Sequence, residues 1–195
     1  MENMGRILIT DIDDVLLDWT KSFDQFIREE YDYNGVYLGD NTQRLWEVLC
    51  IKKGEIFNIM KSHSELQRFN NLEYYKDSIE LLDNFDNFDN IFAITSCGNT
   101  IDIIKKRKYN LNKRFPGIID KVFFLNFLEK KKKILKEIKN KYPTYEIYMI
   151  DDNVNDIQSA ISLGINGYVY TTSFHKHFNL PVVNSLNEFF NNIKG

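Results

Sequence analysis

Short apolar runs alternate with stretches of helical period along most of the chain. Five runs have the length of a β-strand, and the first four are rich in Ile, Val, Phe and Leu, as strands buried on both faces are. We expect strands at residues 7–10, 91–95, 122–125, 147–150 and 167–170. Apolar residues three or four positions apart predict helices at residues 78–85, 131–142 and 156–163. The pattern predicts an α/β fold with a doubly wound, mainly parallel, five-stranded, Rossmann-like sheet.

The interval between the first two expected strands is far longer than the roughly twelve residues that a crossover between parallel strands requires. Two stretches within it, 23–27 and 45–49, have the spacing of apolar residues that is typical of a helix. An inserted subdomain accounts for both observations. We therefore expect a small helical cap at residues 18–72, inserted into a core that consists of residues 1–17 and 73–195.

Composition narrows the class of protein. The chain has 195 residues, of which 43% are hydrophobic, enough to fill a core. Its net charge of −3 gives no global field that attracts nucleic acid or an anionic membrane, so we expect a small partner. No apolar stretch approaches the roughly 18 to 20 residues that span a bilayer. Two cysteines and no recognisable signal peptide predict a cytoplasmic protein.

Acidic residues follow two of the expected strands at the point where each ends. Asp11 and Asp13 come after the first strand, and Asp151, Asp152 and Asp156 after the fourth. The carboxyl ends of parallel strands lie at one edge, where two carboxylates about 4 Å apart repel by roughly 4 kcal/mol at an effective dielectric of 20. A single Asp-x-Asp is more often a turn or a helix cap. Two such groups favour a hard divalent cation such as Mg²⁺, which also serves phosphate chemistry.

Four motifs, in order along nearly the whole chain, carry a family resemblance. They are Asp11-Ile12-Asp13-Asp14-Val15-Leu16, Thr95-Ser96, a lysine at the start of the run 130–133, and Asp151-Asp152-Asn153-Val154-Asn155-Asp156. Each stands at the carboxyl end of an expected strand or at the start of the next helix, where open α/β sheets bind ligands. The chain resembles the haloacid dehalogenase (HAD) superfamily of phosphohydrolases. It departs from the commonest pattern at Asp14, where many members carry Gly.

The resemblance and the chemistry of phosphate esters imply roles for the acidic residues. The ionised carboxylate of Asp11 is a nucleophile that would form an aspartyl-phosphate. Asp13 would protonate the leaving oxygen and later accept a proton from the attacking water. Mg²⁺ would be held by Asp11, the carbonyl of Asp13 and Asp152, which aligns with the principal metal aspartate of the family. Asp151 or Asp156 would contact the metal directly or support its ligands.

The second and third motifs would bind the phosphoryl group. Thr95 and neighbouring N–H groups would donate hydrogen bonds to its oxygens, with Ser96 and Asn99 close enough to assist. One lysine should reach both this group and the aspartates. Lys131 shares the inward face of the expected helix, which makes it our choice for a catalytic residue; Lys130 is the runner-up.

The sequence predicts the class of substrate less precisely than it predicts the residues of the site. The early insertion and the Thr95-Ser96 pair look similar to 5′(3′)-deoxyribonucleotidases of the same superfamily, which implies a small phosphorylated substrate such as a (deoxy)nucleoside monophosphate. The aromatic residues of the cap fit nucleobase stacking, but Phe23 and Phe26 at helical spacing are more often the core of the cap. The alternatives are a sugar-phosphate phosphatase, a nucleic-acid 3′-phosphatase, and a module that binds nucleotide or phosphate without catalysis.

Overall fold

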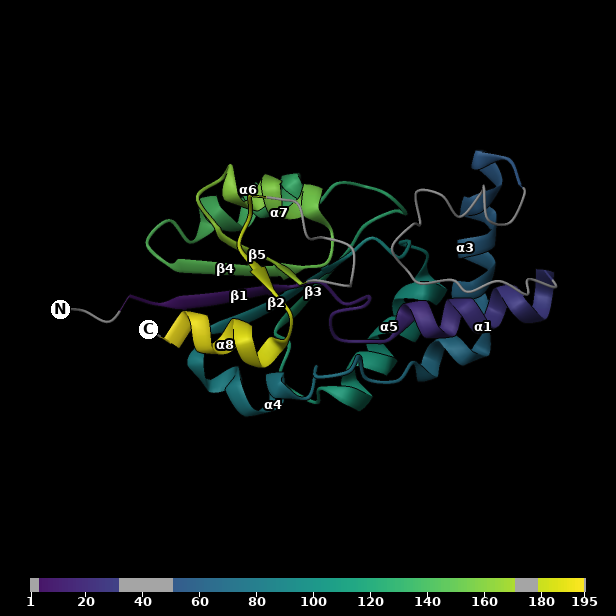
Figure 1. Ribbon diagram of the computed structural model, residues 1–195, viewed down its shortest axis with the longest axis horizontal. Helices are drawn as coiled ribbons and strands as arrows, with labels where there is room; N and C mark the ends of the chain where they lie inside the picture. Colours follow the sequence, from purple (N-terminus) through teal and green to yellow (C-terminus); the bar gives the residue numbers. More distant parts are fainter. Residues whose placement is uncertain (1–3, 32–50, 171–178, 195) are drawn as a thin grey trace.

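The computed structural model describes residues 4–31, 51–170 and 179–194. Its centre is a six-stranded sheet in the order β3-β2-β1-β4-β5-β6, with every neighbouring pair parallel (Figure 1). The strands are β1 (Arg6–Thr10), β2 (Asn90–Thr95), β3 (Lys121–Phe124), β4 (Glu146–Asp151), β5 (Asn166–Tyr170) and β6 (Val182–Val183). The predicted α/β class and parallel sheet are confirmed. The sixth strand was not predicted, because two residues are too few to form a recognisable apolar run.

Helices cover both faces of the sheet. They are α1 (Trp19–Tyr31), α3 (Ile56–Glu65), α4 (Glu80–Asn84), α5 (Ile101–Arg114), α6 (Lys132–Lys141), α7 (Val154–Ile161) and α8 (Leu186–Lys194), with short 3₁₀ turns η2 (Lys53–Glu55), η3 (Gln67–Asn71) and η4 (Phe85–Asn87). Figure 1 shows α6 and α7 on one face and α4 and α8 on the other. None of the described helices is long and apolar enough to cross a bilayer.

Alternation along β1 explains how one strand serves two cores. Ile7 and Ile9 belong to the hydrophobic cluster on the side of α6 and α7, whereas Leu8 belongs to the cluster on the side of α4, α5 and α8. All three side chains are at most 1% exposed. Because β1 lies between β2 and β4, Thr10 pairs with Ala93 on one side and Ile150 on the other. The three strands therefore end at the same edge of the sheet.

The helix α5 was not predicted, for a physical reason. Its buried face consists of Ile103, Arg107, Asn110 and Leu111, so two polar residues interrupt the apolar period. The expected helices 78–85, 131–142 and 156–163 correspond to α4 with η4, α6 and α7. The expected helical stretch 45–49 lies outside the described residues.

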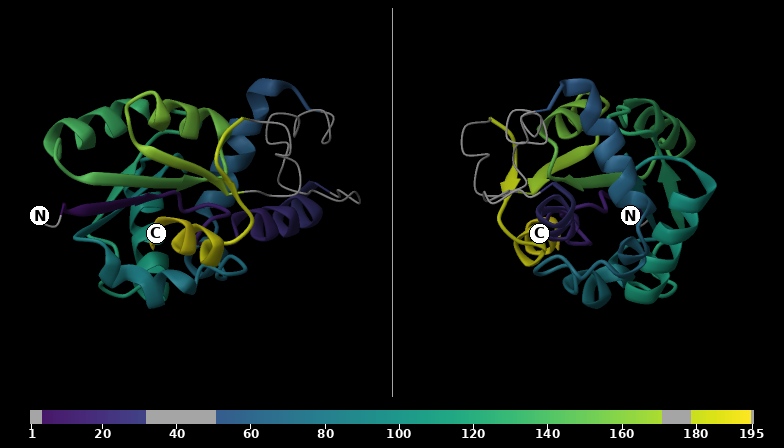
Figure 2. Two further views of the ribbon diagram at one scale, coloured as in Figure 1. Left: turned by 60° about the vertical axis from the view of Figure 1, so that its left-hand side comes forward. Right: turned by 90° about the vertical axis from the view of Figure 1, so that its right-hand side faces the viewer.

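The described part of the segment at residues 18–72, which includes α1 and α3, extends beyond the carboxyl edge of the sheet (Figures 1 and 2). Its aromatic residues pack on one another: the Trp19 and Phe23 rings stack with centroids 4.5 Å apart, and His63 lies against Phe23 and Phe69 at 5.3 and 5.6 Å. Phe23 and Phe69 are fully buried. Trp19, Phe23 and Phe26 of α1 thus form a packed core rather than an open stacking surface.

Two backbone hydrogen bonds join the points where this segment leaves the core and returns to it. The N–H of Asp18 donates to the carbonyl of Glu73 at 3.0 Å, and the N–H of Tyr75 donates to the carbonyl of Leu16 at 3.0 Å. The points where the segment leaves and returns therefore lie side by side, as they do in an inserted subdomain. On this basis we retain as a proposal the division into a cap at 18–72 and a core at 1–17 and 73–195.

Candidate active site

Asp11 is the first residue after β1, in the middle of the sheet. Its backbone N–H donates to the carbonyl of Ile150 at 3.0 Å, which ties the loop after β1 to the end of β4. Its carboxylate Oδ1 accepts a hydrogen bond from the N–H of Ile12 at 2.7 Å and lies 2.8 Å from Lys131 Nζ. Asp11 is therefore fixed at the carboxyl edge of the sheet beside a positive charge.

The end of β4 brings two further carboxylates to Asp11. Asp151 is fully buried; its Oδ2 lies 2.8 Å from Lys131 Nζ, and its Oδ1 accepts from the N–H of Asn153 at 2.8 Å. One carboxylate oxygen from each of Asp11, Asp151 and Asp152 lies within 4.8 Å of the other two. Two stretches that are 140 positions apart in the sequence, 11 and 151, thus meet at one point.

Burial and mutual repulsion shift the ionisation of this cluster. Burial and the charge of Asp151 raise the pKa of Asp11 to about 7, against the opposing effect of Lys131. Burial, followed by the charges of Asp11 and Asp151, raises the pKa of Asp152 well above its ordinary value. Burial acts to lower the pKa of the Lys131 amine, but Asp11 and Asp151 outweigh it and raise that pKa. The charged amine of Lys131 is therefore shared by the carboxylates of Asp11 and Asp151. Ionisation of all three carboxylates at once is unfavourable.

The three carboxylates fit a hard divalent cation. Oxygen ligands from carboxylates are what Mg²⁺ binds in proteins, usually through one or two carboxylates together with water and substrate phosphate. Among the three carboxylates, the negative charge of Asp152 is the least compensated, because Lys131 Nζ contacts the carboxylates of Asp11 and Asp151. A cation beside Asp152 would supply the positive charge that the cluster lacks.

Lys131 and Asp156 are linked. Lys131 immediately precedes α6 and is 3% exposed, whereas its neighbour Lys130 is exposed. The Lys131 backbone N–H donates to Asp156 Oδ1 at 3.3 Å, which fixes the start of α6 against the first turn of α7. The structure therefore directs Lys131, not Lys130, to the carboxylates. Asp156 holds the lysine backbone and lies outside the group of three close carboxylate oxygens.

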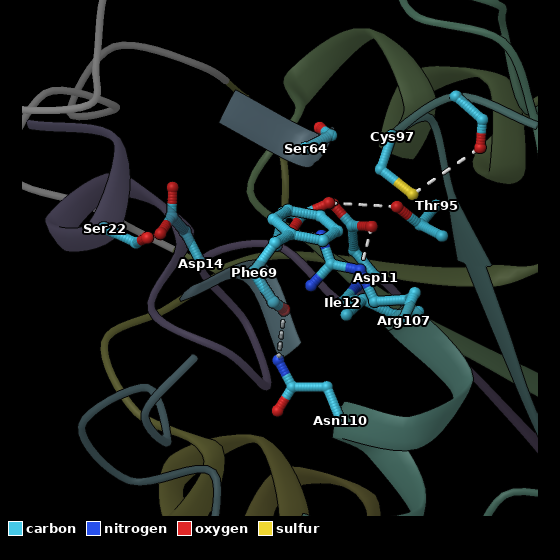
Figure 3. A network of polar contacts seen from close by, with 12 residues as sticks. Asp11, Ile12, Asp14, Ser22, Ser64, Phe69, Thr95, Cys97, Arg107 and Asn110 are labelled. Carbon is cyan, nitrogen blue, oxygen red and sulfur yellow. Dashed lines mark hydrogen bonds and ion pairs between the residues drawn. The ribbon is translucent and has the colours of Figure 1, made fainter. Parts of the chain in front are cut away.

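Asp13 makes different contacts from Asp11. Its Oδ2 accepts a hydrogen bond from the hydroxyl of Thr95 at 2.9 Å, and its Oδ1 lies 2.5 Å from Arg107 Nη2. Thr95, the last residue of β2, is fully buried. Figure 3 shows Arg107 and Thr95 approaching this point from α5 and β2. Both oxygens of Asp13 are therefore occupied by neighbours.

Arg107 is the polar residue of the site that the sequence analysis missed. A signal was present, because Ile103, Arg107 and Leu111 recur at intervals of four and so share one helix face. An arginine amid apolar residues on such a face, in the helix that follows Thr95, is placed to reach the carboxyl edge of the sheet.

Ser96 and Asn99 do not converge with Thr95 in this structure. The hydroxyl of Ser96 donates to the carbonyl of Glu129 at 2.9 Å, and Asn99 is exposed. Their predicted contact with a phosphoryl group remains a prediction. The nearby Cys97 is buried, and burial raises the pKa of its thiol, as expected of a packing residue rather than a nucleophile.

Asp14, which departs from the commonest family pattern, has a structural explanation. Its φ of 58° lies in the left-handed region, where Gly is favoured and Asp is one of the better tolerated residues. One carboxylate oxygen accepts from the N–H of Thr20 at 2.9 Å and the other from the hydroxyl of the same residue. Asp14 thus anchors the first turn of α1. Burial raises its pKa to about 7.

Comparisons with known proteins give two sequence relatives. No protein-family model matches the chain. A 32.4 kDa protein of Enterobacteria phage T4, described as uncharacterized, is 28% identical over 186 residues, which cover 91% of this chain and 64% of that protein. Enolase-phosphatase E1 of Candida tropicalis is 32% identical over 102 residues, 49% of this chain and 42% of the enzyme. The chain spans less than two thirds of the length of these relatives.

Solved structures match over nearly the whole chain. A haloacid dehalogenase-like hydrolase from Streptococcus pneumoniae has a TM-score of 0.69 at 15% identity and covers 99% of this chain and 100% of its own. A magnesium-bound HAD hydrolase from Bacillus subtilis has a TM-score of 0.65 at 12% identity, with 99% and 100% coverage. L-2-Haloacid dehalogenase also shares the fold, with a TM-score of 0.60 at 11% identity over 97% of this chain and 99% of its own. The chain has the fold of the haloacid dehalogenase-like hydrolases.

Proposed function

We propose that this chain is a magnesium-dependent phosphomonoester hydrolase that acts through an aspartyl-phosphate on Asp11. The observation that carries the proposal is the convergence of Asp11, Asp151 and Asp152 around Lys131, with Asp13 two residues beyond the nucleophile. These groups would supply a nucleophile, an acid and a site for a cation at one edge of the sheet. The HAD-like fold of the chain agrees with this chemistry, and the enolase-phosphatase relative adds sequence similarity over half of the chain.

The reaction divides into two transfers. In the first, a carboxylate oxygen of Asp11 attacks phosphorus, the bond from phosphorus to the ester oxygen breaks, and Asp13 gives its proton to that oxygen. In the second, water attacks the same phosphorus, Asp13 takes a proton from it, and inorganic phosphate leaves as the Asp11 carboxylate is restored. Lys131 stabilises negative charge near Asp11 throughout both transfers.

A magnesium ion would be held by Asp11, Asp152 and the carbonyl of Asp13, with Asp151 adjoining. It would supply charge neutralisation for the phosphoryl oxygens. Asp156 is better placed to support Lys131, because its Oδ1 accepts from the lysine backbone. Thr95, whose hydroxyl now donates to Asp13, would donate to a phosphoryl oxygen when substrate is bound.

Dehalogenation is the competing reaction, since a dehalogenase shares the fold. A halide leaves as an anion and needs neither a proton nor a cation on the leaving atom. The alkoxide of a phosphate ester needs a proton, and its phosphoryl group carries charge that a cation offsets. The acid at Asp13 and the close carboxylates around Asp152 therefore favour phosphate esters. A non-catalytic module would not need Asp13 held beside the nucleophile.

For the substrate we propose a small phosphorylated metabolite, with (deoxy)nucleoside monophosphates as the first class to test. The buried state of Phe23 and Phe69 removes these two residues as a stacking surface, so the class follows from the looser likeness to deoxyribonucleotidases. A panel of nucleoside monophosphates, sugar phosphates and a DNA 3′-phosphate should be assayed with Mg²⁺ and with EDTA. Hydrolysis of sugar phosphates alone would refute the nucleotide class, and EDTA-resistant turnover would refute the metal dependence.

The carboxylate cluster predicts how Mg²⁺ affects stability at different pH. Without a cation, the folded chain retains protons on carboxyls such as Asp11, with a pKa of about 7, that the unfolded chain loses at its ordinary value of 3.8. The free energy of unfolding contributed by these groups therefore falls as pH rises between those values. Mg²⁺ replaces the protons, so at pH 8 it should raise the unfolding temperature by about 5 °C, and clearly less at pH 5.5.

Differential scanning fluorimetry with MgCl₂ measures this effect, and Asp152→Asn provides the control. The Mg²⁺ shift should nearly vanish in that variant, because the carboxylate with the least compensation is gone. An equal Mg²⁺ shift at both pH values, or an undiminished shift in Asp152→Asn, would show that the cation binds elsewhere.

A further inference from the structure

Arg107 has an unusual environment for an arginine. It is fully buried in α5, and its Nη2 forms the ion pair with Asp13. Its other two nitrogens, Nε and Nη1, have no nitrogen or oxygen partner among the described residues, and the guanidinium interacts with the buried Cys97 thiol as well as with Asp13. A buried guanidinium with unmet N–H groups is unfavourable, and Asp13 is the carboxylate that offsets its charge. Its pairing with Asp13 ties this buried arginine to the site.

The guanidinium is held in place from the side of η3. Its central carbon lies 4.4 Å from the ring centroid of Phe69, a stacking arrangement that is favourable for arginine. Asn110, three residues further along α5, donates to the carbonyl of Phe69 at 3.2 Å. Figure 3 shows the Phe69 ring beside the Arg107 guanidinium, with the Asn110 side chain reaching the backbone oxygen of Phe69. Phe69 and Asn110 thus restrict the movement of Arg107 relative to Asp13.

The two carboxylate oxygens of Asp13 have different partners, and one partner can be released more easily than the other. The hydroxyl of Thr95 donates to Oδ2. This neutral group can rotate toward a phosphoryl oxygen without separating an ion pair. Arg107 occupies Oδ1 with a buried guanidinium that is stacked on the Phe69 ring. When Thr95 turns to the substrate, Arg107 alone fixes the carboxyl group, and Oδ2 becomes free to carry the proton for the leaving oxygen.

We infer that Arg107 is a positioning residue that orients Asp13 toward the leaving oxygen of the substrate, with Phe69 as its support. The inference rests on the proposed hydrolysis of phosphomonoesters. It adds a residue of α5 that contacts the side chain of the proposed acid, Asp13. It also gives the segment at residues 67–71 a direct influence on the acid, through the stacked ring.

Leaving-group dependence separates positioning of the acid from general support of the fold. p-Nitrophenolate leaves readily without a proton, whereas the alkoxide of glycerol 2-phosphate requires one. In Arg107→Gln we expect kcat/KM for glycerol 2-phosphate to fall about 100-fold, within the range of general acid catalysis, and that for p-nitrophenyl phosphate to fall less than about 3-fold. Arg107→Lys, which keeps the charge, should recover part of the loss. The ratio of the two values does not depend on the fraction of folded protein.

Arg114→Gln is the matched control. Arg114 is also on α5, its guanidinium lies 4.8 Å from the Tyr74 ring centroid, and its Nε donates to the carbonyl of Leu72, but it forms no ion pair with Asp13. In Arg114→Gln, the ratio of kcat/KM for glycerol 2-phosphate to kcat/KM for p-nitrophenyl phosphate should equal that of the wild type. Equal losses for both esters in Arg107→Gln, or no loss for either, would overturn the inference while wild-type hydrolysis leaves the proposed function standing. Failure of the wild type with both esters and Mg²⁺ would instead contradict the function and the inference together.

Discussion

Replacement of Asp11 by Asn is expected to lower kcat/KM for p-nitrophenyl phosphate with Mg²⁺ at least about 1,000-fold, because the amide is not a nucleophile. The two side chains have nearly the same shape, so the substitution should act on the reaction and on Mg²⁺ binding rather than on the fold. Asp11 is a buried carboxyl whose pKa is raised to about 7. Its loss removes repulsion from Asp151 and Asp152, and the unfolding temperature of the metal-free protein should not fall.

Asp86→Asn is the control for this substitution. Asp86 is exposed, lies in η4 and is remote in the fold from the carboxyl edge of β1. Its variant should retain wild-type kcat/KM. Full activity in Asp11→Asn, with the same Mg²⁺ dependence, would exclude Asp11 as the nucleophile and leave the cluster without a catalytic role.

Lys131→Ala is the second substitution with a large expected effect. Its Nζ lies 2.8 Å from carboxylate oxygens of both Asp11 and Asp151, and the residue is 3% exposed. Removal of one partner from a buried ion pair commonly costs about 3 to 5 kcal/mol, so the free energy of unfolding without Mg²⁺ should fall by roughly that amount. We also expect kcat/KM to fall about 100-fold, because the charge near the phosphoryl group is lost.

Urea denaturation and steady-state kinetics of Lys130→Ala provide the comparison. Lys130 is exposed and one position earlier, so both the unfolding free energy and kcat/KM should stay close to wild type. The opposite outcome, a fully active Lys131→Ala beside an inactive Lys130→Ala, would mean that the described contacts of Lys131 are not those of the working enzyme.

Much of the site was predictable because strand ends place residues with little freedom. Once residues 7–10 and 147–150 are recognised as buried parallel strands, the positions of Asp11 and Asp151 follow from the sheet itself. Helical spacing likewise selected Lys131 over Lys130, since Leu135 and Ile138 define the inward face of the helix. The periodicity of apolar residues, together with the rule that parallel strands end at the same edge of a sheet, therefore accounts for the carboxylate cluster.

The remaining features depend on packing that local patterns indicate only weakly or not at all. The buried face of α5 mixes Ile103 and Leu111 with Arg107 and Asn110, so its apolar period is broken and the helix was missed. The partner of Arg107 is Asp13, 94 positions away. The strand Val182–Val183 is defined by pairing with β5 rather than by its own two residues. Such features come from tertiary contacts, which sequence spacing alone does not encode.

The central claim is that Asp11 carries the phosphoryl group, and trapping of the covalent intermediate tests it directly. Protein that is turning over p-nitrophenyl phosphate with Mg²⁺ should be quenched in acid, reduced with borohydride and digested for peptide mass spectrometry. Borohydride reduces an aspartyl-phosphate to homoserine, so the account predicts homoserine at position 11 and nowhere else. Turnover without any modified residue, or a phosphoryl group recovered on another side chain such as Cys97, would contradict it.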